Sequence, residues 1–188
     1  MKRLILASML LPAVFPGTAL AHPGHVHDAQ FIHGLAHPVG GVDHLLAMVT
    51  LGLLAAQLGG RAIWALPATF VGAMLAGGAM GAGGMGLPAV EPMILASVVV
   101  LGVLVAMAVR LPLEALVPVV VIFGAAHGWA HGAEGPATGL GLYAAGFALA
   151  TMALHLGGIA FGRLLSRGLE LRVLGGGTAL AGLALAVG

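Results

Sequence analysis

Apolar stretches long enough to cross a membrane fill almost the whole chain, and short polar segments separate them. They run over residues 31–58, 62–80, 88–109, 113–131, 138–161 and 171–187. A helix needs about 20 mainly apolar residues to cross the hydrocarbon core of a bilayer. We therefore predict an all-α fold, a polytopic membrane bundle of about six transmembrane helices.

The charge content excludes the soluble classes of protein. Residues with charged side chains make up 7% of the chain and hydrophobic residues 60%, whereas a soluble domain carries about 25% charged residues. The formal net charge of +1 gives no basis for binding nucleic acid. The expected partner is thus the lipid bilayer, and assembly into a homo-oligomer stays open.

The N-terminus has the features of a secretory signal peptide. Residues 1–21 combine a positively charged start, a short apolar middle and a small-x-small cleavage site that ends at Ala21. The alternative is an uncleaved first membrane helix, although two prolines interrupt the segment. Cleavage would leave a histidine-rich extracytoplasmic segment, residues 22–30, followed by a six-helix transmembrane domain, residues 31–188.

The new N-terminus would carry metal donors. His22, His25 and His27 lie close together after the cleavage site, and the free α-amine beside His22 is a further nitrogen donor. Imidazole nitrogens bind divalent transition metals. We expect this segment to capture a metal ion, and a plain polar linker is the alternative.

Positive charge predicts the orientation of the spans. With the N-terminus outside, the loops facing the cytoplasm contain every arginine of the mature chain, namely Arg61, Arg110, Arg163, Arg167 and Arg172. Cytoplasmic loops are enriched in Arg and Lys. We therefore predict a multi-pass protein of a bacterial-type inner membrane, with both termini on the periplasmic side.

The first motif lies inside the first apolar stretch and reads His37-Pro38-Val39-Gly40-Gly41-Val42-Asp43-His44. At helical spacing four side chains share one stripe: His33, His37, His44 and Met48. Proline and paired glycines indicate that the helix loosens here and frees backbone groups to line a cavity. A carboxylate such as Asp43 costs about 2.5–3.5 kcal/mol in a membrane, which a bound divalent cation would offset.

The second motif lies in the fourth apolar stretch and reads His127-Gly128-Trp129-Ala130-His131-Gly132-Ala133-Glu134. His127 and His131 are four residues apart, so both imidazoles fall on one side of a helix, and Glu134 follows within a turn. Such a pair is a clamp of two nitrogen donors. His155, in the fifth stretch, is either a relay ligand or a single histidine hydrogen-bonded to a neighbour.

Glycines recur every fourth residue in three of the predicted helices. The positions are Gly77 and Gly81, Gly124, Gly128 and Gly132, and Gly158 and Gly162. Small residues at this spacing allow helix backbones to approach closely within a bilayer. We expect the glycines to serve packing and to present His127 and His131 to a close neighbouring helix.

Imidazole and carboxylate donors suit Ni, Co, Zn or Cu(II), and the absence of Cys removes any thiolate site. The chain has no phosphate-binding Gly-x-x-x-x-Gly-Lys loop, so it does not itself hydrolyse ATP. Ion movement through the two motifs is the first functional hypothesis. A membrane-embedded, metal-dependent hydrolase, with Asp43 or Glu134 as base, is the alternative.

Both motifs, together with Met48, resemble those of the HupE/UreJ family of nickel permeases, and the resemblance covers the whole chain. It implies a transport protein rather than an enzyme, with no prosthetic group. The expected cargo is Ni²⁺, or less often Co²⁺, which supplies metalloenzymes such as hydrogenase or urease. The implied metal-handling positions are His37, Asp43, His44, His127, His131 and Glu134.

Overall fold

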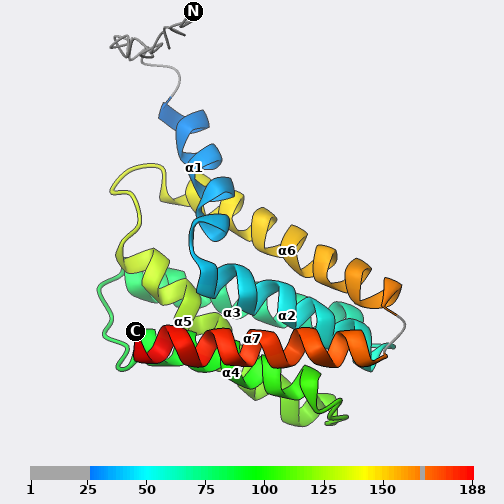
Figure 1. Ribbon diagram of the computed structural model, residues 1–188. Coiled ribbons are helices and arrows are strands. Elements are labelled where there is room, and N and C mark those ends of the chain that lie inside the picture. Colours follow the sequence, from blue (N-terminus) through cyan, green and yellow to red (C-terminus); the bar gives the residue numbers. More distant parts are fainter. Residues whose placement is uncertain (1–25, 166–167) are drawn as a thin grey trace, which may run out of the picture.

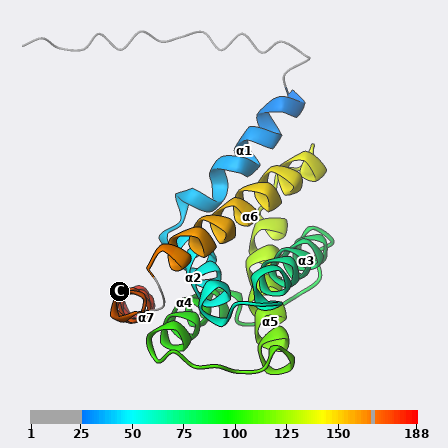
Figure 2. The same cartoon turned by 90° about the vertical axis from the view of Figure 1, so that its right-hand side faces the viewer.

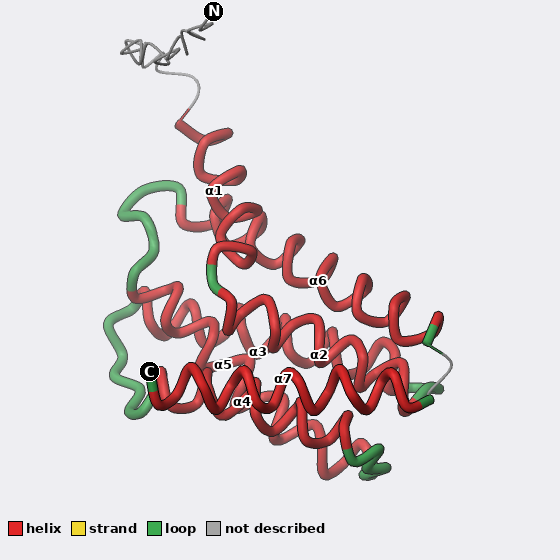
Figure 3. The backbone as a smooth tube through the Cα atoms, in the orientation of Figure 1, coloured by secondary structure: helices red, strands yellow, loops and turns green. Residues whose placement is uncertain are grey.

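A computed structural model describes residues 26–165 and 168–188, which form seven α-helices joined by short loops (Figures 1 and 3). No strand occurs within these two ranges, and the all-α prediction is confirmed. The proposed signal peptide, His22 and His25 lie outside the described residues. The helices are α1 Val26–Gly40, α2 Val42–Leu58, α3 Ala62–Ala82, α4 Val90–Ala106, α5 Leu113–Ala133, α6 Leu140–Leu164 and α7 Leu169–Val187.

The helices correspond to the predicted spans, except that one helix is short and one span is divided into two helices. Helices α3, α5, α6 and α7 are each long and apolar enough to cross a membrane. Helices α1 and α2 together make a fifth candidate span, which is broken by a bend of 82°. Helix α4 is apolar but shorter, with 17 residues. It occupies the third predicted stretch.

The break in the first span falls inside the first motif. Gly41 separates α1 from α2 and has an extended backbone, with φ −107° and ψ 124°. Pro38, near the end of α1, has no N–H group to continue the helical hydrogen bonds. The sequence predicted a loosened helix at this point, and the structure places there an elbow between two helices.

Helix α2 is the centre of the bundle. Seen from one end, it lies among α3, α4, α6 and α7 (Figure 2). Almost every residue from Ala47 to Gln57 is buried, including the polar side chains of Thr50 and Gln57. Because α2 is surrounded, His44 in its first turn is held inside protein rather than against lipid.

Glycines set the spacing between the closest helix pairs. A Cβ added at Gly128 or Gly132 would overlap a backbone carbonyl of α3, and one added at Gly77 would overlap a carbonyl of α5. Gly52 and Gly158 bring α2 and α6 together in the same way, as Gly102 and Gly175 do for α4 and α7. The predicted role of these glycines in close packing is confirmed at the described positions.

The connections alternate between the two ends of the bundle (Figure 1). The α2–α3 and α4–α5 connections lie at one end, where α6 ends and α7 begins. Arg61 and Arg110 lie in these connections, Arg163 in the last turn of α6 and Arg172 near the start of α7. The other end has the C-terminus and the α3–α4 and α5–α6 connections. The elbow between α1 and α2 lies toward this second end, so both motifs are remote from the arginines.

Gly77 and Gly72 provide a matched test of this packing on one helix. A methyl group at Gly77 meets the backbone of Ala125, whereas one at Gly72 meets no atom within 4 Å. We expect Gly77→Ala to destabilise the bundle by about 1–3 kcal/mol, because α3 and α5 must separate. Gly72→Ala should be neutral or slightly stabilising. Unfolding of both variants in detergent micelles measures the difference, and equal stability would contradict the assigned helix contact.

Candidate metal site

Four imidazole rings from the two motifs form a continuous series, which we call the outer histidine row. It consists, in order of contact, of His37 on α1, His131 on α5, His44 on α2 and His127 on α5. The ring centroids of His37 and His131 are 4.6 Å apart, those of His131 and His44 4.5 Å, and those of His44 and His127 4.7 Å. The fold thus brings together motifs that are far apart in the sequence.

Burial increases along the row. His33, one turn before His37 on α1, is exposed, and its ring centroid is 5.7 Å from that of His37. His37 and His131 are partly buried, His44 is 9% exposed and His127 is fully buried. The row therefore leads from an exposed imidazole into the interior of the bundle.

A cavity of about 490 Å³ opens beside the elbow. Its lining residues are His33, Ala36, His37, Gly40, Gly41, Asp43, His44 and His131. Most of the polar groups in this lining are imidazoles, joined by one carboxylate. The bend between α1 and α2 thus turns the first motif into the wall of a cavity, as expected for a loosened helix that frees groups for a polar space.

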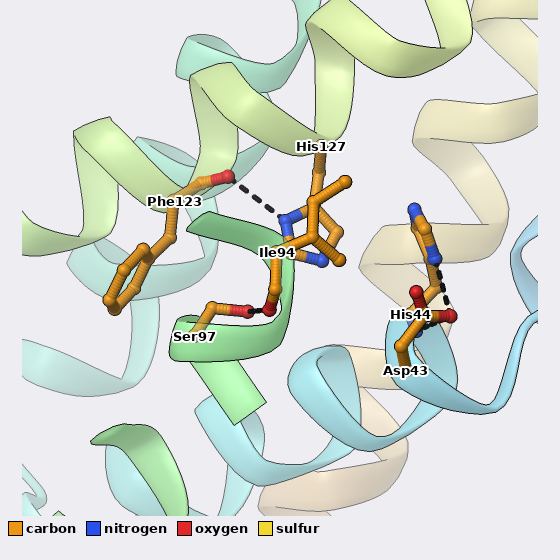
Figure 4. A network of polar contacts seen from close by, with 6 residues as sticks. All are labelled: Asp43, His44, Ile94, Ser97, Phe123 and His127. Atoms are coloured by element: carbon orange, nitrogen blue, oxygen red, sulfur yellow. Dashed lines mark hydrogen bonds and ion pairs between the residues drawn. The ribbon is translucent and has the colours of Figure 1, made fainter. Parts of the chain in front are cut away.

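The ring of His127 is oriented by its own helix. Its Nδ1 lies 3.0 Å from the carbonyl oxygen of Phe123, one turn earlier on α5 (Figure 4). A carbonyl only accepts hydrogen bonds, so Nδ1–H is the donor. In the neutral ring the lone pair is then on Nε2, the atom free to bind a metal.

His44 is oriented in a similar way by Asp43 (Figure 4). Asp43 Oδ1 accepts hydrogen bonds from the His44 ring, at 2.8 Å from Nδ1, and from the His44 backbone N–H, also at 2.8 Å. Carboxylates that hold one nitrogen of a metal-binding histidine are a common outer-shell arrangement. In this geometry Asp43 holds the ring, and His44 Nε2 is left for a ligand.

Several nitrogens of the row have no hydrogen-bond partner among the described residues. They are Nε2 of His44, Nε2 of His127 and both ring nitrogens of His131. A buried polar atom without a partner costs about 1–3 kcal/mol. Within the described ranges, no group of three or more His, Asp or Glu side chains is arranged to hold one metal ion.

The glycines of the motifs make room for these rings. A Cβ at Gly41 would lie 2.8 Å from Asp43 Oδ1 and 3.1 Å from His44 Nδ1, although the backbone conformation of Gly41 suits any residue. Gly128 and Gly132 follow His127 and His131 and contact the backbone of α3. Position 41 therefore favours glycine because a side chain there would meet Asp43 and His44, and not because the backbone conformation needs glycine.

The remaining predicted residues lie around the row or apart from it. Glu134 caps the end of α5 and is exposed, and its carboxylate makes no hydrogen bond or ion pair with the described residues. Met48 is fully buried in the core, one turn beyond His44 on α2. His27 lies in the first turn of α1, of which only the backbone is described.

Sequence reasoning missed the aromatic wall that α6 provides. Phe147 packs its ring 4.4 Å from that of His131, and Tyr143 lies 5.7 Å from His37 and 5.4 Å from His33. Both aromatic side chains are nearly fully buried. The signal was present, since Tyr143, Phe147, Thr151 and His155 recur every fourth residue and so share one face of α6.

The fold and this arrangement define a class: a multi-pass helical membrane protein with imidazoles gathered inside its bundle. A family model described as HupE / UreJ protein matches residues 9–185. The chain is 43% identical to Protein HupE of Rhizobium leguminosarum bv. viciae over 195 residues, with 100% of both chains covered. The chain therefore belongs to the HupE/UreJ family, as its motifs predicted. No solved structure matches it.

Gly41 and Gly40 are adjacent at the elbow and provide a matched test of whether the Asp43–His44 pair needs a glycine beside it. A Cβ at Gly40 meets no atom within 4 Å, whereas one at Gly41 meets the Asp43–His44 pair. We expect Gly41→Ala to weaken the hydrogen bond to His44 Nδ1 and Gly40→Ala to preserve it. Nitrogen-15 NMR of histidine-labelled protein reports that bond. An unchanged His44 signal in Gly41→Ala would show that the pair adapts to the methyl group.

Proposed function

We propose that the chain is a permease for the uptake of divalent transition-metal ions, with Ni²⁺, or less often Co²⁺, as cargo. One observation carries the proposal: an outer histidine row with unpartnered nitrogens leads from a cavity into an apolar bundle. Imidazole nitrogens are ligands that nickel accepts. Membership of the HupE/UreJ family supports the same cargo.

In the proposed mechanism, the ion first meets the segment that contains His22, His25 and His27. It then enters the cavity at the elbow, where His37 and His131 replace part of its water shell. His44 Nε2 and His127 Nε2 receive it next, because Asp43 and the Phe123 carbonyl keep these two atoms free. Conduction requires binding that is favourable yet weak enough for release, so successive pairs of donors are suitable.

The outer residues Glu134 and His33 have a supporting role in this proposal. Both lie at the end of the bundle opposite the arginine-bearing connections. A carboxylate near the entrance raises the local concentration of cations. Met48 lies one turn beyond His44 and offers a thioether on the same face of α2, whereas the 82° bend separates this face from His33 and His37 on α1.

The membrane potential is the proposed driving force. In the proposed orientation the chain lies in a bacterial-type inner membrane, with the arginine-bearing end facing the cytoplasm and both termini facing the periplasm. A divalent ion that enters a compartment 100 mV more negative gains about 4.6 kcal/mol, twice the value for one charge. Uptake then needs no bound nucleotide. The ion would be delivered to metalloenzymes such as hydrogenase or urease.

Uptake of radiolabelled nickel into liposomes that contain the pure protein tests the proposal. We expect uptake that increases with an inside-negative potential. It should fall by about 10–100-fold or more in a His37→Ala, His44→Ala double variant, since losing ligands costs at least as much as losing their outer-shell partners. The control is Thr178→Ala, which removes a buried polar group from α7, a helix that contributes nothing to the row.

Absence of uptake by folded wild-type protein, with or without a potential, would contradict the permease proposal. Uptake by the double variant at the wild-type rate would retain the permease but exclude the first motif from its pathway.

External pH provides a further prediction. Imidazole binds metal in its neutral form, and its usual pKa is about 6.5. Protons therefore compete with the ion at lower pH, and we expect slower uptake at an external pH of about 5 than at about 7.5. The internal pH and the potential are held constant in this measurement. Equal rates at the two values would argue against histidine ligation.

A further inference from the structure

His155 is the one histidine of the described core that belongs to neither motif. It lies on α6 and is fully buried. Neither of its ring nitrogens has a hydrogen-bond partner among the described residues. An imidazole kept only for packing is expected to have a partner for its polar atoms, since most buried polar groups are paired. Within the described ranges His155 is therefore not hydrogen-bonded to a neighbour, which was one of the two hypotheses from the sequence.

The ring of Phe70 connects His155 to the end of the outer histidine row. Phe70 is fully buried on α3. Its ring centroid is 5.3 Å from that of His127 and 5.2 Å from that of His155, with an edge-on arrangement in both contacts. One aromatic ring therefore separates the innermost imidazole of the row from a further unpartnered imidazole.

Neighbouring contacts hold this arrangement in register. Thr151 donates a hydrogen bond to the sulfur of Met74 at 3.7 Å. Thr151 lies one turn before His155 on α6, and Met74 lies one turn after Phe70 on α3. The contact holds α3 against α6 one helical turn from Phe70 and from His155.

Between His127 and the arginine-bearing end of the bundle, α5 has no further imidazole. The buried side chains of α5 nearer the arginine-bearing end are Ala126, Phe123, Val120 and Leu116, all apolar. An ion that leaves His127 therefore finds no nitrogen donor on α5. Across Phe70, His155 has two ring nitrogens without a hydrogen-bond partner in the part of the chain that the structure describes.

We propose that His155 is an inner metal-binding residue, which receives the ion from His127 after the Phe70 ring moves aside. The inference rests on the proposed uptake function and adds to it a binding point beyond the outer histidine row. Two points separated by a ring satisfy the need for several weak sites along a conduction path. The ligand is a divalent transition-metal ion of the class that accepts imidazole nitrogen.

The natural absence of cysteine permits a direct test of ligation. We would replace His155→Cys, so that the chain has one thiol, and add excess Co²⁺ to the purified protein in nanodiscs. A thiolate bound to Co²⁺ gives a sulfur-to-metal charge-transfer absorption that no other group in this chain can give. The matched control is Ala179→Cys, a buried position on α7 that packs against Gly102 of α4. We expect the band in His155→Cys and not in the control.

Transport gives the second readout. His155→Leu removes the donor, and His155→Gln keeps a polar side chain as a second variant in case the first fails to fold. We expect Ni²⁺ to bind the outer histidine row as in wild type, while uptake falls about tenfold or more, at least the effect of losing an outer-shell partner. A purely structural role would instead change outer binding and thermal stability together.

The outcomes separate the two proposals. A band in His155→Cys, with slowed uptake and intact outer binding in the other variants, supports the inner site. No band in folded His155→Cys, or uptake by folded His155→Gln within about twofold of wild type, overturns it and leaves the permease intact. A band in a protein whose wild type takes up no metal would retain the site and refute the transport function.

Discussion

Contact between helix backbones at glycines controls every part of the structure that holds the histidines. Gly128 and Gly132 bring α5 against α3, while Gly52 and Gly158 bring α6 against α2. Helices in lipid gain no hydrophobic free energy from association, so this close packing is a main source of their attraction. Imidazoles from α1, α2 and α5 can touch only because the helices behind them are so close. The glycines thus set the dimensions of the site without contributing a donor atom to it.

The broken first span determines which side chains meet. A straight helix over residues 31–58 would have placed His37 and His44 along one line, facing a single neighbour. The bend of 82° instead turns α1 across the end of α6 while α2 continues into the core. His37 therefore reaches His131 from one direction and His44 reaches it from another. His131 of the second motif therefore contacts one histidine on each of the two helices that carry the first motif.

Much of the architecture followed from the sequence, but the partners of individual side chains did not. Apolar length predicted the helices, Pro38 and Gly41 predicted the break, and spacing predicted the shared face of His127 and His131. Spacing identifies a face of a helix and not the helix that it meets. The hydrogen bond from His44 to Asp43 and the position of Phe70 beside two imidazoles depend on tertiary packing. The sequence placed Asp43 among the metal-handling residues, but it did not predict that Asp43 Oδ1 accepts a hydrogen bond from His44 Nδ1.

The order of synthesis has a consequence for how this bundle is completed. Helix α2 leaves the ribosome early, yet its principal neighbour α6 follows only after residue 140. Until α6 and α7 are inserted, α2 lacks its main covering helix and Thr50 lacks Thr178, its hydrogen-bond partner on α7, and polar side chains facing lipid are costly. A nascent chain that stops before α6 is thus left with polar groups exposed inside the bilayer. Such a chain is a natural substrate for membrane quality control.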